Sequence, residues 1–331
     1  MDDDLGATLA ARLRAGDLAA APAVLNLVET RTPAAQAQTA LLLDGLSPAA
    51  LGHEPPGHVV GVTGPPGAGK STLLSELVRS YRRLGRSVAV LAVDPSSRRT
   101  GGSLLGDRAR IHVDPNDASV FIRSTAAGDR LGGLAWATRA AAQALSAAFD
   151  VVIVETVGVG QSETDVADVA DTVMVIVQPG SGDALQFLKS GIMEIPDVLV
   201  VTKADLGRIA ERAKADVRSA LRSIGDRSTK VVAVSSLPPA TGFDDLIEVL
   251  DAHRARADVA SSRRDARRRT AIDDFRLEHG ERALRALGGR QAALRALAAT
   301  RDDLAVPILV QQLERAAGLS GADRDPTEAG R

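Results

Sequence analysis

The chain has 331 residues, 45% of them hydrophobic, which predicts one large domain with appendages, or two domains. Its formal net charge of −2 does not favour a nucleic acid or a membrane surface as partner. It contains no cysteine, which excludes disulfides and thiolate metal sites. An acidic, polar start and the lack of an apolar run of about 18–20 residues predict a cytoplasmic protein without a membrane span.

The first elements in chain order are two or three short helices within residues 5–47, followed by a Gly/Pro-rich linker. Strands then alternate with helices. The predicted strands are continuously apolar rather than alternating, which is typical of strands buried on both faces of a parallel sheet. We therefore expect an α/β fold with a mostly parallel sheet flanked by helices, and helical extensions at both ends. The predicted strands cover residues 58–64, 87–93, 119–124, 150–156, 171–178, 197–203 and 230–236.

From about residue 262 the strand patterns stop, and the sequence reads as helix interrupted at Gly288 and Gly289. Four leucines there fall at near-heptad spacing on one face, which suggests a homodimer contact. They are Leu284, Leu287, Leu294 and Leu297. The predicted units are a helical extension (1–50), a nucleotide-binding domain (55–255), a helical dimerisation region (262–318) and a disordered tail (319–331).

"GPPGAGKS", residues 64–71, matches the phosphate-binding loop G-x-x-x-x-G-K-[ST] between a predicted strand and a helix. In such a P-loop, backbone N–H groups surround the β-phosphate, while Lys70 reaches the β- and γ-phosphate oxygens and the Ser71 hydroxyl binds Mg²⁺. The sequence therefore predicts a P-loop NTPase. The residues expected to contact the nucleotide here are Gly64, Pro65, Pro66, Gly67, Ala68, Gly69, Lys70, Ser71 and Thr72.

"VLVVTKAD" places Lys203 and Asp205 at the end of a strand, where GTPases carry the [NT]-K-x-D element that reads guanine. The carboxylate accepts hydrogen bonds from guanine N1–H and N2–H₂, and the lysine stem covers the ring. Adenine lacks this donor pair, so ATP would leave a buried Asp205 unpaired at a cost of about 1–3 kcal/mol. Thr202 stands where Asn is commonest, and we expect it to hold the loop less tightly. Ser235 and Ser236, after the next strand, are expected to contact guanine O6 through their backbone.

Acidic residues follow two further strands. Glu155 ends the strand expected beside the P-loop, where a carboxylate holds Mg²⁺ through water. Gly158 is placed to offer its N–H to the γ-phosphate and to lose that contact on hydrolysis. Asp94 and Asp107 are each candidates to bind Mg²⁺ or to orient the attacking water, although Asp94 also fits a simple turn before Pro95.

Together these motifs resemble the methylmalonyl-CoA mutase-associated GTPase chaperones, once described as lysine/arginine/ornithine transport kinases. The resemblance covers roughly residues 55–250 and rests on "GPPGAGKST", "AVDPSS", "GGSLLGDR", "ETVGVGQSE" and "GDALQFLKSGIMEI" in this order. It implies catalytic roles for Lys70, Asp94, Asp107 and Glu155, with Mg²⁺ bound by the three carboxylates and Ser71, and a nucleotide-sensing loop from Gln178 to Lys189. It also implies GTP or GDP as ligand and an adenosylcobalamin-dependent acyl-CoA mutase as partner.

Two other functions compete with a GTP-gated chaperone. A small-molecule kinase would require an Arg/Lys-rich lid, which we do not find. A nickel-insertion GTPase would require a His- or Cys-rich tract, whereas the chain has five scattered histidines. The arginines within 254–290 are interleaved with acidic residues, which is typical of a solvated helix face rather than a nucleic-acid surface.

Overall fold

The structure is a computed structural model that describes residues 4–94, 111–126, 136–156, 166–180 and 196–319. Asp107 and Gly158 lie outside the described residues, as do the predicted sensing loop from residue 181 onward and the tail from residue 320. Of Asp94, the backbone alone is described.

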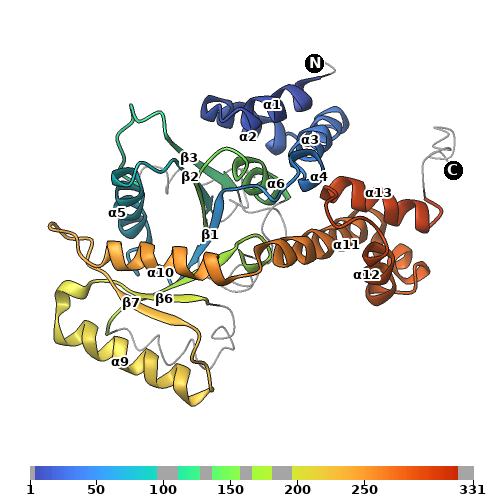
Figure 1. The fold of residues 1–331 in the computed structure, drawn as a ribbon. Helices are drawn as coiled ribbons and strands as arrows, with labels where there is room; N and C mark the ends of the chain where they lie inside the picture. The colour runs from blue at the N-terminus through green and yellow to red at the C-terminus, as the bar shows by residue number, and fades with distance from the viewer. Residues whose placement is uncertain (1–3, 95–110, 127–135, 157–165, 181–195, 320–331) are drawn as a thin grey trace, which may run out of the picture.

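The core of the molecule is a sheet of seven parallel strands in the order β3-β2-β4-β1-β5-β6-β7 (Figure 1). The strands are β1 (His58–Thr63), β2 (Val88–Asp94), β3 (Val120–Ala126), β4 (Val151–Thr156), β5 (Thr172–Val177), β6 (Val198–Val201) and β7 (Lys230–Ala233). The predicted α/β class and parallel sheet are therefore confirmed. The apolar runs read correctly as strands because helices cover both faces, so neither set of alternating side chains meets water.

The two faces of the sheet form two separate hydrophobic clusters. Val59 and Val152 point to one face, whereas Val60 and Ile153, next along the same strands, point to the other. The first face is covered by α6 (Trp136–Leu145), α9 (Arg208–Ser223) and the N-terminal helices, and the second by α5 (Lys70–Arg83) and α10 (Phe243–Arg256).

The N-terminal extension packs on the first face through α6. Thr32 and Ser47 each accept a hydrogen bond from the backbone at a helix N-terminus, which explains two of the helix starts. Its helices are α1 (Leu5–Arg14), the 3-10 turn η1 (Leu18–Ala20), α2 (Ala21–Glu29), α3 (Pro33–Gly45) and α4 (Pro48–Leu51).

The C-terminal extension consists of α11 (Val259–Ala286), α12 (Arg290–Ala298) and α13 (Val306–Ala316), which lie beyond the sheet in Figure 1. The predicted break at Gly288 and Gly289 is present because both have positive φ, of 89° and 82°. The predicted helix is also interrupted inside α11, at Gly280. None of the described helices combines the length and the apolarity needed to cross a membrane.

The leucine face predicted for a dimer contact is used inside the chain instead. Leu284 and Leu297 are 6% and 1% exposed and pack with Phe275 and Leu313 in a third hydrophobic cluster. Leu287 and Leu294 pack against the same cluster. The C-terminal extension therefore has a hydrophobic core of its own, which the apolar side chains of α13 complete.

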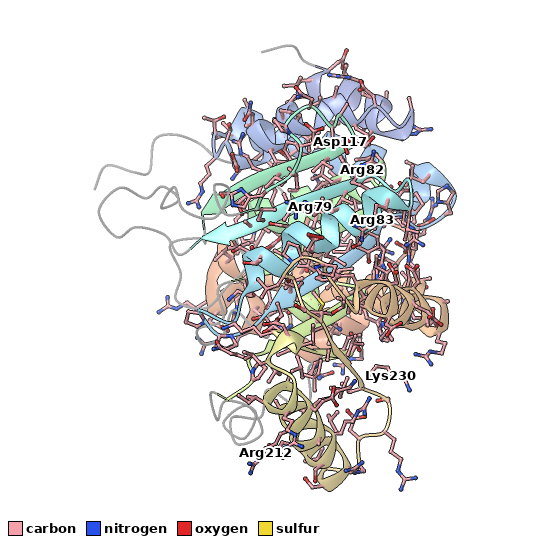
Figure 2. All side chains as sticks on the ribbon, turned by 90° about the vertical axis from the view of Figure 1, so that its left-hand side faces the viewer. Arg79, Arg82, Arg83, Asp117, Arg212 and Lys230 are labelled. Carbon is pink, nitrogen blue, oxygen red and sulfur yellow. The ribbon has the colours of Figure 1, made fainter. Side chains whose placement is uncertain are left out.

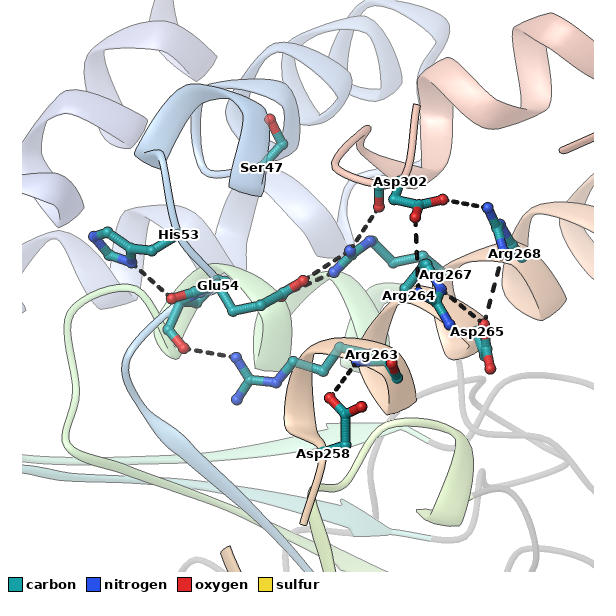
Figure 3. Close-up of polar contacts among 12 residues, drawn as sticks. Ser47, His53, Glu54, Asp258, Arg263, Arg264, Asp265, Arg267, Arg268 and Asp302 are labelled. Carbon is teal, nitrogen blue, oxygen red and sulfur yellow. Dashed lines mark hydrogen bonds and ion pairs between the residues drawn. The ribbon is translucent and has the colours of Figure 1, made fainter. Parts of the chain in front are cut away.

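Ion pairs join α11 to the nucleotide-binding domain. Arg267 forms a two-pronged pair with Glu54 and also donates to the Asp302 carbonyl (Figure 3). Arg263 donates to both oxygens of Asp171, whose side chain is 1% exposed. Asp171 also accepts from the backbone of Val59 at the start of β1, so this pair fixes α11 against the central strands.

His58 is a buried histidine at the start of β1. Its Nε2 lies 2.8 Å from Thr172 Oγ1, which in turn lies 2.8 Å from His253 Nδ1. Burial lowers the pKa of His58 to about 4, and the nearby Asp171 offsets only part of that effect. The imidazole is therefore neutral in the folded protein at neutral pH.

We expect His58 to make the stability pH-dependent on the acidic side of neutrality. Its folded pKa lies below its unfolded value, so its contribution is present above the unfolded pKa and is lost as pH falls toward the folded one. Because one pKa unit is about 1.4 kcal/mol, the loss between about pH 7 and about pH 5 is about 2 kcal/mol. His58→Gln should lack this component in urea unfolding, whereas the exposed-site control His53→Gln should follow wild type. Parallel pH profiles for wild type and His58→Gln would contradict the assignment.

Candidate nucleotide site

The P-loop joins β1 to α5 at the carboxyl edge of the sheet. Gly64 approaches β5 so closely that an added Cβ would lie 2.8 Å from the Ile176 carbonyl oxygen. Gly67 and Gly69 have positive φ of 79° and 87° and open space around them, which suits a loop that curls around a ligand. Lys70 Nζ donates to the carbonyls of Gly64 and Pro65, at 2.8 and 3.1 Å.

The carboxylate at the end of β4 lies beside this loop. Glu155 is paired in register with Val62 on β1 and with Ala92 on β2, and it is 4% exposed. Gly64 follows Val62 by two residues on one side, and Asp94 follows Ala92 by two residues on the other. The sheet thus brings together three of the predicted positions, although the Asp94 side chain and the whole of Asp107 and Gly158 are outside the description.

Two hydroxyls at the same edge are buried and find no hydrogen-bond partner among the described residues. Thr63 ends β1 and Thr156 ends β4, and they are 1% and 0% exposed. Buried hydroxyls without partners are unfavourable, so bound water, an ion or a ligand is needed to satisfy them. Neither threonine was selected from the sequence, because their positions matter only once β1 and β4 are known to be neighbours.

The predicted base reader lies at the end of β6, on the other side of the P-loop. Among described residues other than glycine, Lys203 alone has positive φ, 55°, a conformation that costs about 1 kcal/mol or more and is concentrated at functional sites. Ser235 Oγ donates to Asp205 Oδ1 at 2.8 Å, and Ala204 N–H donates to the Val234 carbonyl at 3.0 Å. These contacts join the two loops expected to surround the base. Ser235 is buried and Ser236 is partly buried beside it.

Two expectations about this element need correction. Asp205 is exposed rather than buried, because it sits on the short turn η5 (Ala204–Leu206) beyond the strand end. A nucleotide itself would have to cover it. Thr202 does not leave the loop loose: its Oγ1 donates to the Ala68 carbonyl at 2.9 Å and is 3.4 Å from that of Val177.

Gln178 is a residue whose place here the sequence did not reveal. It follows β5, and its amide satisfies both neighbours in one orientation, with Nε2 donating to the Gly67 carbonyl at 3.0 Å and Oε1 accepting from Lys203 Nζ at 3.1 Å. It therefore touches the phosphate loop and the base reader at once. The sequence had marked Gln178 only as the start of a sensing loop.

A pocket of about 90 Å³ lies elsewhere, between α6, α11 and the turn η3 (Val166–Asp168), and includes none of the predicted nucleotide residues. Trp136 and Val169 line it, together with Arg139 and Asp274, which form an ion pair at 3.1 Å. Burial raises the pKa of Asp274 to about 6, and Arg139 opposes that shift.

Three arginines, Arg79, Arg82 and Arg83, lie along α5 and are labelled in Figure 2. Arg79 pairs with Glu76 at 2.7 Å, and Arg82 pairs with Asp117 at 2.7 Å. Arg82 therefore attaches α5 to the residues before β3. Arg79 and Arg82 are thus each paired with a nearby carboxylate.

Comparison with known proteins shows which family this chain resembles. The family described as "Methylmalonyl Co-A mutase-associated GTPase MeaB" matches residues 21–285. A putative GTPase of Caulobacter vibrioides is 43% identical over 81% of this chain and 84% of its own. A putative GTPase of Pyrococcus horikoshii is 48% identical over 59% of each chain, so the match spans about three fifths of that relative.

A solved structure, the crystal structure of an LAO/AO transport system kinase, superposes with a TM-score of 0.60. It is 30% identical and covers 95% of this chain and 98% of its own. The resemblance seen in the motifs is thereby confirmed over most of the chain. The chain belongs to the methylmalonyl-CoA mutase-associated GTPase family MeaB, and it is accordingly a GTPase that binds guanine nucleotides.

Proposed function

We propose that this GTPase is a chaperone that gates the loading of adenosylcobalamin into an acyl-CoA mutase and protects and reactivates that mutase. The main observation in support is that the P-loop and the proposed guanine-reading loop lie in contact at one edge of the sheet. The chain that carries them belongs to a mutase-associated family. Gln178, at the start of the proposed sensing loop, contacts both the P-loop and Lys203, which supports a link between nucleotide binding and that loop.

For the nucleotide, we propose that residues 64–72 hold the phosphates and that Lys203, Asp205, Ser235 and Ser236 hold the guanine. Mg²⁺ fits the donor set, because Ser71, Asp94, Asp107 and Glu155 offer only oxygen and hydroxyls of Thr63 and Thr156 are buried without described partners nearby. When bound, the ion would neutralise phosphate charge. Lys70 would exchange its loop carbonyls for phosphate oxygens, and Gly158 would supply an N–H to the γ-phosphate.

We expect GTP turnover to be slow alone and to rise when a cobalamin-dependent mutase is added. No glutamine directly follows Gly158, where many GTPases place the one that orients water; Gln161 comes three residues later. Switch GTPases that lack a preset water and arginine hydrolyse at about 10⁻⁴–10⁻² s⁻¹, and a partner that completes the site adds about 10³–10⁵-fold in the best cases.

The measurement is GTPase rate against added mutase for wild type, Asp183→Ala and Lys189→Ala, with the exposed-site variant Lys230→Ala as control. The first two variants remove charges from the proposed sensing loop, so stimulation should fall while the basal rate stays. Fast hydrolysis without a partner, or stimulation that survives both substitutions, would count against the gating role. Cobalamin transfer to the apo-mutase, followed by absorbance, then tests loading itself.

We also infer a homodimer formed through the C-terminal extension. α11 carries Leu277, which is 44% exposed although it follows the buried Phe275 by only two residues. Burying a leucine at an interface stabilises it by about 1.5–3 kcal/mol. Leu277→Glu should therefore weaken the dimer about tenfold or more in sedimentation of the full chain, whereas Leu84→Glu, which alters an exposed leucine after α5, should not. A wild-type monomer at high concentration would end the idea.

A further inference from the structure

Two neighbouring side chains, one just after β5 and one just after β6, form hydrogen bonds with the backbone of the P-loop. Val177 and Val201 are register partners in these parallel strands, so Gln178 and Thr202 follow at equivalent positions. Gln178 Nε2 donates to the Gly67 carbonyl at 3.0 Å, and Thr202 Oγ1 donates to the Ala68 carbonyl at 2.9 Å. Two consecutive carbonyls in the middle of the loop are thus fixed by adjacent strands.

Fixing a carbonyl also fixes the following N–H. In a trans peptide the two groups point in opposite directions, so the Ala68 carbonyl held by Thr202 turns the Gly69 N–H away from the sheet. Amide groups oriented in this way form the concavity that binds phosphate in P-loops. The shorter of the two contacts of the Thr202 hydroxyl is thus with the phosphate loop.

Gln178 differs from Thr202 because its other amide atom reaches the base reader. Oε1 accepts from Lys203 Nζ at 3.1 Å, so the ammonium is held toward the P-loop. Lys203 has left-handed backbone geometry, with φ of 55°, and is followed by the turn that carries Asp205. The backbone and the ammonium of Lys203 are thus constrained separately, the second by Gln178.

We propose that Gln178 is a positioning residue that couples guanine recognition to the geometry of the phosphate loop. It does so as a single amide that donates to Gly67 and accepts from Lys203. This inference rests on the proposed roles of the P-loop and of Lys203. A primary amide is suited to this place because it carries both a donor and an acceptor; a carboxylate keeps only the acceptor, and a thioether of similar length has neither strong group.

The coupling is measured with pyrophosphate, which binds the P-loop but has no base for Lys203 to cover. In wild type, Lys203→Met removes the donor that holds the Gln178 amide, so pyrophosphate affinity should fall about threefold. In a Gln178→Met background the same substitution should change pyrophosphate affinity by less than about 1.5-fold. Affinities come from displacement of a fluorescent GDP analogue. The coupling sought, about 0.6 kcal/mol for a threefold effect, lies within the usual range for side chains in one network.

Guanosine, which lacks phosphates, tests whether Gln178 affects binding of the base. Gln178→Met should weaken guanosine about threefold, whereas Gln178→Glu, which still accepts from Lys203, should bind it within about twofold of wild type. Gln311→Met, on the exposed face of α13, is the matched control and should bind both ligands like wild type. A role confined to folding would lower the melting temperature without separating the Glu and Met variants on guanosine.

Three results would overturn the coupling: pyrophosphate affinity unaffected by Lys203→Met in wild type, an equal loss in both backgrounds, or guanosine binding alike in Gln178→Glu and Gln178→Met. GDP binding that still depends on Lys203 in those cases would leave the proposed function intact. Failure of wild type to bind either GDP or pyrophosphate would instead remove the proposed function, and the coupling with it.

Discussion

Replacing Lys70 by alanine lowers the rate of GTP hydrolysis at least about 100-fold and leaves the fold intact. Removing one preorganised group that stabilises charge in a transition state typically costs about 10²–10³-fold in kcat. The ammonium is the first side-chain cation after the loop glycines and is partly buried beside them. Its ammonium donates to the Gly64 and Pro65 carbonyls, so the substitution removes these two hydrogen bonds and costs folding about 1–3 kcal/mol.

The test is single-turnover hydrolysis with saturating GTP, together with a thermal unfolding curve. Lys230→Ala is the matched control, because Lys230 is an exposed lysine at the start of β7 (Figure 2) and should leave the rate unchanged. Turnover at the wild-type rate in Lys70→Ala would show that the P-loop assignment is incorrect. A variant that fails to fold is recognised from its unfolding curve, and Lys70→Met, which keeps the stem of the side chain, then takes its place.

Asp205→Asn should reverse the base preference of the protein. Wild-type Asp205 offers two carboxylate oxygens to guanine N1–H and N2–H₂, and Ser235 holds one of them at 2.8 Å. Hydrogen bonds to a charged group contribute about 1.5–3 kcal/mol each, so GDP should bind about 100-fold more weakly or worse to the variant. Xanthine carries a carbonyl where guanine has its amino group, and an amide can donate to it, so XDP should bind better to the variant than to wild type.

Calorimetry with GDP, XDP and ADP gives the answer. Asp216→Asn, at an exposed position on α9, serves as the control and should keep the wild-type order of affinities. If the wild-type protein bound GDP and ADP with equal affinity, this loop would not be the element that recognises guanine. Because Asp205 is exposed without ligand, the discrimination must arise when the base covers it, and the substitution should scarcely change the stability of the free protein.

The parts of this molecule that follow from local pattern were predictable, and those that depend on register or on distant partners were not. Seven apolar runs gave seven parallel strands, and Glu155 lies next to the P-loop strand as expected. The fate of Leu284 and Leu297 depended on α13, whose packing no spacing rule reveals. The contacts of Gln178 with the P-loop and Lys203 depend on the register of β5 with β6, which puts Gln178 next to Thr202.

Asp205 shows a different limit. The apolar run before it correctly predicted the strand, but burial of the strand does not extend to the turn that follows. The exposure of a side chain just past a strand end depends on whether another segment covers it, and that is a tertiary property. The expectation that Thr202 holds the loop less tightly failed because of a segment that does come close. The P-loop backbone approaches the strand end so closely that the short threonine hydroxyl reaches the Ala68 carbonyl.

The pocket between α6 and α11 gives the protein an optical reporter of its own. Trp136 is the sole tryptophan of the chain, and it lines this pocket beside Val169, just after η3. Arg139 and Asp274 place charges in the same pocket, and indole emission responds to nearby charge. Fluorescence excited in the indole band therefore samples one junction, that of α6, η3 and α11, in the unlabelled wild-type protein. Rapid-mixing kinetics with nucleotide can follow that junction directly, without an attached dye.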